Sequence, residues 1–120
     1  MDFDKLVKSD QFLVQLRGTC SGDDNITKLT NLLVEAVQCG AARVWLDCRQ
    51  LTQIDYRGLR VLLQFLPQFE ARGTTLLLCG LQPAVQERLD ASGLASLLTL
   101  LPAEAYNGPD APKSQNSRLQ

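Results

Sequence analysis

The sequence of 120 residues contains no histidine. Histidine is the commonest general base, the commonest metal ligand and the usual partner of a serine or cysteine nucleophile, so these chemistries lose their main signature. The chain also lacks the two glycine-rich patterns that hold phosphates, G-x-x-x-x-G-K-[ST] and G-x-G-x-x-G. We therefore predict a protein that is not an enzyme and that carries no cofactor and no metal.

The chain has almost no net charge, with 12 basic and 13 acidic residues. Without a basic stripe, neither nucleic acid nor an acidic lipid surface is favoured as a partner. No apolar run approaches the roughly 20 residues that a membrane span needs. The first residues, "MDFDKLVKSD", lack the basic and apolar regions of a signal peptide. These absences predict a cytoplasmic protein that does not insert into a membrane.

Cysteine is present four times, as Cys20, Cys39, Cys48 and Cys79, but never in a C-x-x-C pair. In a reducing cytosol, cysteines at such spacings are expected to remain free thiols. Hydrophobic residues make up 45% of the chain and charged residues 21%, which is typical of one ordinary globular domain. We assign residues 1–106 to this domain, and we predict that the polar, proline-containing residues 107–120 form a disordered tail.

Hydrophobic periodicity and turn residues predict the elements of the domain. Strands are expected at 2–8, 12–17, 43–48 and 74–80, and the first two are joined by a turn into a hairpin. Helices are expected at about 25–39, with Asp24 as the N-cap, at 58–73, and from Pro83 to Gly93. Pro67 should kink or divide the second helix. Residues 97–102 fit either a last strand or a short apolar turn.

This alternation of strands and helices predicts an α/β layer structure with parallel central strands. Functional groups in such sheets gather at the carboxyl ends of the strands. Asp47 is expected to end one strand, where an aspartyl nucleophile is conceivable. The position two residues later is Arg49, so the second acid that such chemistry needs is missing. We interpret Asp47 as a residue that caps a loop or pairs with Arg49 or Arg43.

The stretch Asp55-Tyr56-Arg57-Gly58 stands between a strand and an apolar helix. A helix N-terminus has unpaired N–H groups and a partial positive charge, so Asp55 is well suited to cap it. Gly58 permits close approach of the backbone or a tight turn. Tyr56 either covers the strand ends or is exposed with Arg57, and exposed Tyr and Arg are enriched in protein-binding hot spots.

The region "VWLDCRQLTQIDYRGLRVLLQFLPQFEARGTTLLLCGLQPAVQERLDASGL" resembles a STAS domain, the family of anti-sigma factor antagonists and of cytoplasmic domains of sulphate transporters. The resemblance extends over roughly residues 5–106. It implies a single-domain STAS-like α/β fold, with a mixed sheet of four or five strands and helices packed mainly on one side. It also implies partner switching, in which a kinase phosphorylates a serine directly after the motif aspartate.

The chain departs from the family pattern, which is close to D-S-[ST]-G, at the position of the phosphorylated serine. Asp55 and Gly58 match the pattern, but Tyr56 and Arg57 replace both hydroxyl residues. We therefore predict no phosphorylation site here. Tyr56 is expected to anchor a partner, and Arg57 to select an acidic one. With Arg60, these four residues form the predicted partner-binding site.

The resulting hypothesis is a protein-binding STAS domain of bacterial signalling, similar to an anti-sigma factor antagonist and without the serine switch. Its partner would be an anti-sigma factor or a kinase-like ATPase domain. Two alternatives stay open: a regulatory subunit of a lipid or solute transporter, and a small-molecule-binding domain or cryptic enzyme with a pocket beside Asp55. The sequence leaves homo-oligomerisation undetermined, since the edge strand at 2–8 is able to pair between chains without being obliged to do so.

Overall fold

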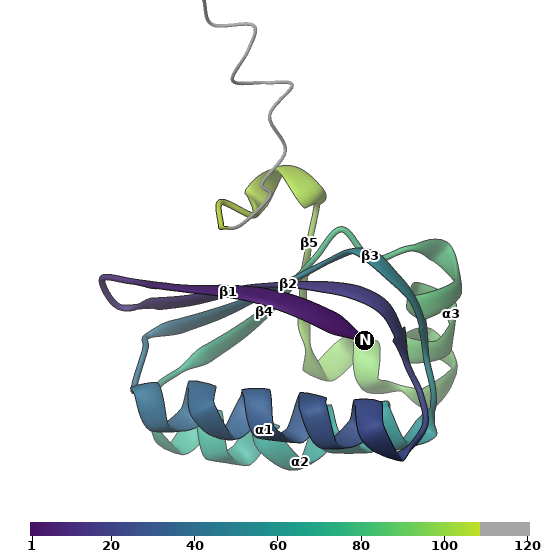
Figure 1. The fold of residues 1–120 in the computed structure, drawn as a ribbon, viewed down its shortest axis with the longest axis horizontal. Helices are drawn as coiled ribbons and strands as arrows, with labels where there is room; N and C mark the ends of the chain where they lie inside the picture. Colours follow the sequence, from purple (N-terminus) through teal and green to yellow (C-terminus); the bar gives the residue numbers. More distant parts are fainter. Residues whose placement is uncertain (109–120) are drawn as a thin grey trace, which may run out of the picture.

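Five strands form one mixed sheet in the computed structural model, which describes residues 1–108. They lie in the order β1 (Asp2–Lys8), β2 (Gln11–Cys20), β3 (Arg43–Ile54), β4 (Thr75–Cys79) and β5 (Thr99–Leu101). β1 runs antiparallel to β2, and every other neighbouring pair is parallel. The predicted α/β class and mixed sheet are confirmed, and the last strand, which the sequence left open, is present (Figure 1).

Helices supply the crossovers between the parallel strands. They are α1 (Asp23–Cys39), α2 (Tyr56–Ala71) and α3 (Pro83–Ser92), with short 3₁₀ turns η1 (Leu94–Leu97) and η2 (Ala103–Ala105). α1 and α2 lie side by side under one face of the sheet, as predicted, and α3 stands beside the curved end of β3 (Figure 1). Within residues 1–108, none of the helices has the length and apolarity required to cross a bilayer.

The main core lies between the sheet and the helices. Alternate residues of each strand face this layer, for example Phe12, Val14 and Leu16 of β2, because successive strand side chains point to opposite faces. The helices add residues at helical spacing. Those of α1 are Leu29, Leu32, Leu33, Ala36 and Val37, and those of α2 include Leu59, Leu62, Phe65 and Phe69.

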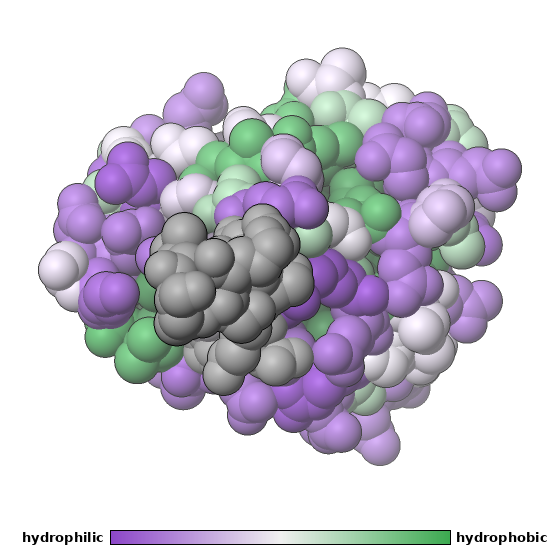
Figure 2. All heavy atoms as spheres, turned by 90° about the horizontal axis from the view of Figure 1, so that it is seen from above, coloured by the Kyte–Doolittle hydropathy of each residue, from purple (hydrophilic) through white to green (hydrophobic). Residues whose placement is uncertain are grey.

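A smaller apolar cluster lies on the other face of the sheet, which α1 and α2 leave open. Tyr106 follows η2, packs with Leu13 and Cys79, and is only 2% exposed. The chain then passes so close that a Cβ at Gly108 would lie 2.6 Å from Leu13 Cβ. Figure 2 shows apolar atoms on this face, surrounded by hydrophilic ones. The predicted disorder of the tail concerns mainly residues 109–120, which lie outside the described residues.

β2 and β3 are both longer than predicted, and they pair in parallel from Gln11 opposite Arg43 to Cys20 opposite Ile54. The added residues look like loop sequence, and it is the pairing between the two strands that stabilises their extended conformation. The register shifts twice, between Gln15 and Arg17 and between Gly18 and Thr19. Asp47 therefore lies within β3, and the prediction that it ends a strand is wrong.

Two further local predictions are wrong. The N-cap of α1 is Gly22 with φ 84°, and Asp24 lies in the first turn. An acidic residue in that turn still complements the helix dipole. Of the two effects predicted for Pro67, division of α2 is wrong, because the helix continues from Tyr56 to Ala71, and a kink stays a prediction.

The two tyrosines of the chain provide a test of the packing on the open face. We expect Tyr106→Ala to lower the free energy of unfolding by about 3–5 kcal/mol, because it empties a buried aromatic site. Tyr56→Ala, the matched control, removes an exposed ring and should change it by less than about 0.5 kcal/mol. Urea unfolding of both variants measures the difference. Equal values for the two variants would show that Tyr106 contributes no buried packing.

Candidate functional site

Two loops meet at the carboxyl ends of β2 and β3, at the right-hand end of Figure 1. One runs from Cys20 into α1, and the other runs from Ile54 into α2. The Asp55 N–H donates a hydrogen bond to the Cys20 carbonyl oxygen at 3.0 Å, which continues the pairing of the strands by one residue. The N-termini of α1 and α2 therefore begin beside one another.

Asp55 is the N-cap of α2, which confirms its predicted structural role. Its Oδ1 accepts a hydrogen bond from the Gly58 N–H at 3.0 Å. Burial alone would raise the pKa of the Asp55 carboxyl. The backbone N–H groups of Gly58 and Gly22, the Arg57 guanidinium and the Arg57 N–H outweigh burial and lower the pKa below its ordinary value. Asp55 therefore stays ionised and binds donors from both helix starts.

Gly58 lies where α2 crosses closest to the strand ends. A Cβ on this residue would lie 2.7 Å from Ile54 Cγ1 and 3.0 Å from Cys20 Sγ. Any larger side chain would force Ile54, Cys20 or α2 itself to shift. The glycine is thus required by close packing, as the sequence suggested, and it sets the position of the first turn of α2.

Arg57 turns back toward its own chain. Its guanidinium forms an ion pair with Asp23 in the first turn of α1 and lies 3.7 Å from Asp55 Oδ2. The side chain is half exposed, so these contacts are screened by solvent. Arg57 joins the two loops and is held beside Tyr56.

Tyr56 projects into solvent, with 72% of its surface exposed. The Arg88 guanidinium of α3 lies over its ring, 5.7 Å from the centroid, at a distance suited to a cation–π contact. Tyr56 and Ser92 line two neighbouring surface hollows. Arg60 lines one of these hollows as well. The sequence indicated Tyr56 and Arg60, but nothing in it pointed to Arg88, which comes from a distant helix.

The exposed surface continues along α2 as an apolar stripe. Leu63 lies seven residues after Tyr56, on the same helical face, and is 45% exposed. A further groove brings Leu63 together with Leu97 of η1, which is 60% exposed. We call the set Tyr56, Arg60, Leu63, Arg88 and Leu97 the Tyr56 surface. Exposed apolar groups bordered by cations are typical of a protein-binding surface.

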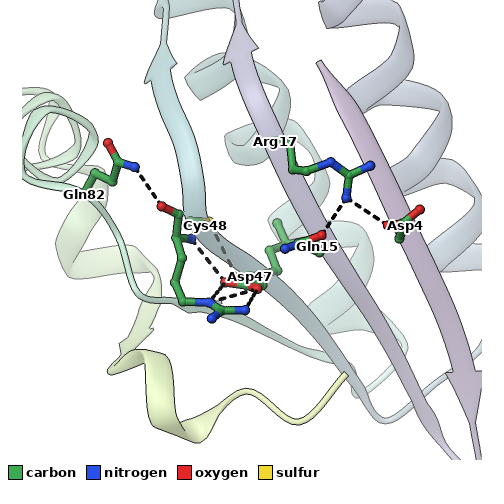
Figure 3. A network of polar contacts seen from close by, with 8 residues as sticks. Asp4, Gln15, Arg17, Asp47, Cys48 and Gln82 are labelled. Carbon is green, nitrogen blue, oxygen red and sulfur yellow. Dashed lines mark hydrogen bonds and ion pairs between the residues drawn. The ribbon is translucent and has the colours of Figure 1, made fainter. Parts of the chain in front are cut away.

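A second polar cluster lies in mid-sheet, away from this surface (Figure 3). Asp47 is fully buried, and its Oδ2 lies 2.7 Å from Arg49 Nη2, which confirms the predicted pairing with Arg49. Gln15 stands opposite Asp47 on β2 and accepts a hydrogen bond from Arg17 at 2.5 Å. Arg17 also pairs with Asp4. A carboxylate that is closed off from solvent in this way is not exposed to a substrate.

The three buried cysteines all have raised pKa values. Burial, and then the Asp55 carboxylate, raise the pKa of Cys20 to about 11. Burial, and then Asp47, raise the pKa of Cys79 to about 11. Burial also raises the pKa of Cys48 far above its usual range. These thiols stay protonated at neutral pH, and a protonated thiol is neither a nucleophile nor a metal ligand.

Comparison with known proteins identifies relatives of this fold. The family profile of the STAS domain matches residues 10–106. An anti-sigma factor antagonist from Mycobacterium paratuberculosis superposes with a TM-score of 0.65 at 17% identity, covering 83% of this chain and 86% of that one. The Bacillus cell fate determinant SpoIIAA, in its phosphorylated form, superposes with a TM-score of 0.67 at 16% identity. The match covers 99% of this chain and 100% of that one.

A sulfate transporter family protein from Wolinella succinogenes is also similar, with a TM-score of 0.65 at 22% identity, covering 81% of this chain and 80% of that one. At such low identities, these three likenesses establish the shared fold.

Substitution of Gly58 tests the close approach of α2. We expect Gly58→Ala to lower the free energy of unfolding by about 1–3 kcal/mol, because the added methyl group overpacks against Ile54 and Cys20. Ile54→Ala should partly relieve the clash, so the double variant should be less destabilised than the sum of the two single variants. Denaturant unfolding of all four proteins measures this coupling. Strict additivity would contradict the packing described here.

The pH dependence of stability tests the charge of Asp55. A group whose pKa is lowered in the folded state stabilises above its unfolded pKa, and this contribution is lost as the pH falls through the folded value. We expect Asp55→Asn, which keeps a capping side chain, to be less stable than wild type by about 0.5–1 kcal/mol at pH 7. The difference should shrink below about pH 4. A difference that is independent of pH would exclude a role for the charge.

Proposed function

The chain belongs to the STAS domain family, and from that premise we propose that it is a non-enzymatic protein-binding domain of bacterial signalling, similar to an anti-sigma factor antagonist. Its partner is an anti-sigma factor or a kinase-like ATPase domain in the cytoplasm. The observation that supports this proposal best is Tyr56, an aromatic side chain that is 72% exposed at the start of α2, with Arg88 over its ring and Arg60 lining the same hollow.

The proposed contact site contains Asp55, Tyr56, Arg57, Gly58 and Arg60, each with a distinct task. Asp55 and Gly58 set the backbone of the first turn of α2. Arg57 holds this turn against α1 through Asp23. Tyr56 and Arg60 are left to meet the partner, as an aromatic anchor and as a charge that favours an acidic surface.

We further propose that this binding is not controlled by a serine switch. The residue directly after the motif aspartate is Tyr56, so a serine/threonine kinase finds no acceptor there. The Arg57 guanidinium next to it already has Asp23 and Asp55 as partners. The partner would then be bound constitutively, with its level or its own ligands deciding when the complex forms.

A second candidate is a regulatory subunit of a transporter assembly. The fold likeness to the Wolinella succinogenes protein, which belongs to a sulfate transporter family, favours it. The same Tyr56 surface would then contact a transporter subunit. The two candidates differ in the class of protein that the domain retains.

Capture of partners from native cytosol and membranes tests the proposal. We expect the wild-type domain to retain an anti-sigma factor or kinase-like ATPase, identified by mass spectrometry. Tyr56→Ala combined with Arg60→Glu should weaken the affinity for the purified partner at least tenfold, because anchor and charge are both lost. Calorimetric titration of the purified pair measures the change.

Arg72→Glu is the matched control, since it reverses one exposed cation at the opposite end of α2. It should leave the affinity unchanged. Retention of transporter subunits that depends on Tyr56 would instead support the second candidate. Equal affinities for wild type and the double variant would rule out the Tyr56 surface as the docking site, and ligand screening around Asp55 would then follow.

A further inference from the structure

Within residues 1–108, β1 forms one border of the sheet and pairs with β2 alone. It lies at the front of Figure 1, with its other edge facing outward. Six of its seven residues are exposed, and only Phe3 is half-buried. Leu6 and Val7 expose 44% and 53% of their surfaces. An edge of this length presents unpaired N–H and C=O groups and is a template for another strand.

The charges of β1 are segregated along the strand. Asp2 and Asp4 occupy its first half, whereas Lys5 and Lys8 follow. Natural edge strands often carry lysines that repel a second strand. Here the two acids balance the two lysines, so β1 carries no net charge that would keep copies apart.

This charge order is complementary to itself when two copies pair antiparallel. In antiparallel pairing about Lys5 or Leu6, Lys8 stands opposite Asp2 or Asp4 of the second strand. Parallel pairing in register would place acid opposite acid and lysine opposite lysine, which is destabilising. The strand thus selects an antiparallel, two-fold arrangement of identical copies.

Pairing about Leu6 also covers the exposed apolar residues. Leu6 would then meet Leu6 of the second copy, and Val7 would meet the aliphatic stem of Lys5. Lys5 and Asp4 keep their partners in their own chain, because Lys5 pairs with Glu35 of α1 and Asp4 pairs with Arg17 of β2.

We propose that β1 binds β1 of a second copy of this chain, antiparallel and two-fold about Leu6, so that one continuous sheet runs through a homodimer. This inference goes beyond the proposed function and rests on a different part of the molecule. The Tyr56 surface, at the carboxyl ends of β2 and β3, stays free in both copies. A single pair of strands buries less surface than a standard interface, so the dimer should be weak and dependent on concentration.

Sedimentation velocity over a range of concentrations tests the charge complementarity, using the full chain with any tag at its C-terminus. We expect wild type to dimerise and Lys8→Glu to raise the dissociation constant about tenfold or more, because two attractive pairs become repulsive. Arg72→Glu makes the same change of charge away from β1 and should leave the constant unchanged. A wild-type protein that stays monomeric, or equal constants for the two variants, would overturn the proposal.

Disulfide trapping tests the register independently. Opposite residues in antiparallel strands have Cα atoms about 4.5–5.5 Å apart, which a disulfide can bridge. In a Cys39→Ser background, which removes the exposed native thiol, Leu6→Cys should give a covalent dimer under mild oxidation. Asn31→Cys, an exposed position on α1, is the control and should not.

Circular dichroism of each variant separates loss of pairing from loss of folding. If Lys8→Glu fails to fold, the trapping experiment decides alone. Failure of Leu6→Cys to cross-link faster than Asn31→Cys would overturn the two-fold pairing, whatever the outcome of partner capture at Tyr56.

Discussion

The parallel pairing of β2 with β3 up to Cys20 and Ile54 is the constraint on which the rest of the structure depends. Because both strands end at the same level, the two helices that follow them start side by side. Asp55 extends the pairing through its N–H and at the same time receives the N–H groups of the helix starts. α2 then approaches the strand ends so closely that a Cβ at position 58 would overlap the side chains of Ile54 and Cys20.

This arrangement separates the charges of the site into two sets. Arg57 pairs with Asp23 and lies near Asp55, so these charges are partly compensated within the chain. Arg88 lies over the exposed Tyr56 ring, and Arg60 lines a hollow together with Tyr56. The inner set links the two loops, and the outer set is exposed to solvent.

Much of the fold could be predicted from the sequence, because apolar periodicity and capping are local. The N-cap role of Asp55 and the pairing of Asp47 with Arg49 depend on neighbouring residues, and both predictions are confirmed. The added lengths of β2 and β3 could not be predicted, since residues such as Gly18 and Thr52 are typical of loops and become extended only through pairing between distant strands. Arg88 was missed because it lies on α3 and meets Tyr56 of α2 only through tertiary packing.

The position of Tyr106 has a consequence for synthesis of the chain. Its ring completes the apolar cluster on the open face, next to Leu13, yet it is made almost a hundred residues later. Until Tyr106 has left the ribosome, Leu13 and Cys79 are without the aromatic ring that covers them. A nascent chain that already contains every strand therefore still exposes apolar surface on that face. This apolar surface must be protected from premature contacts until Tyr106 is available to cover it.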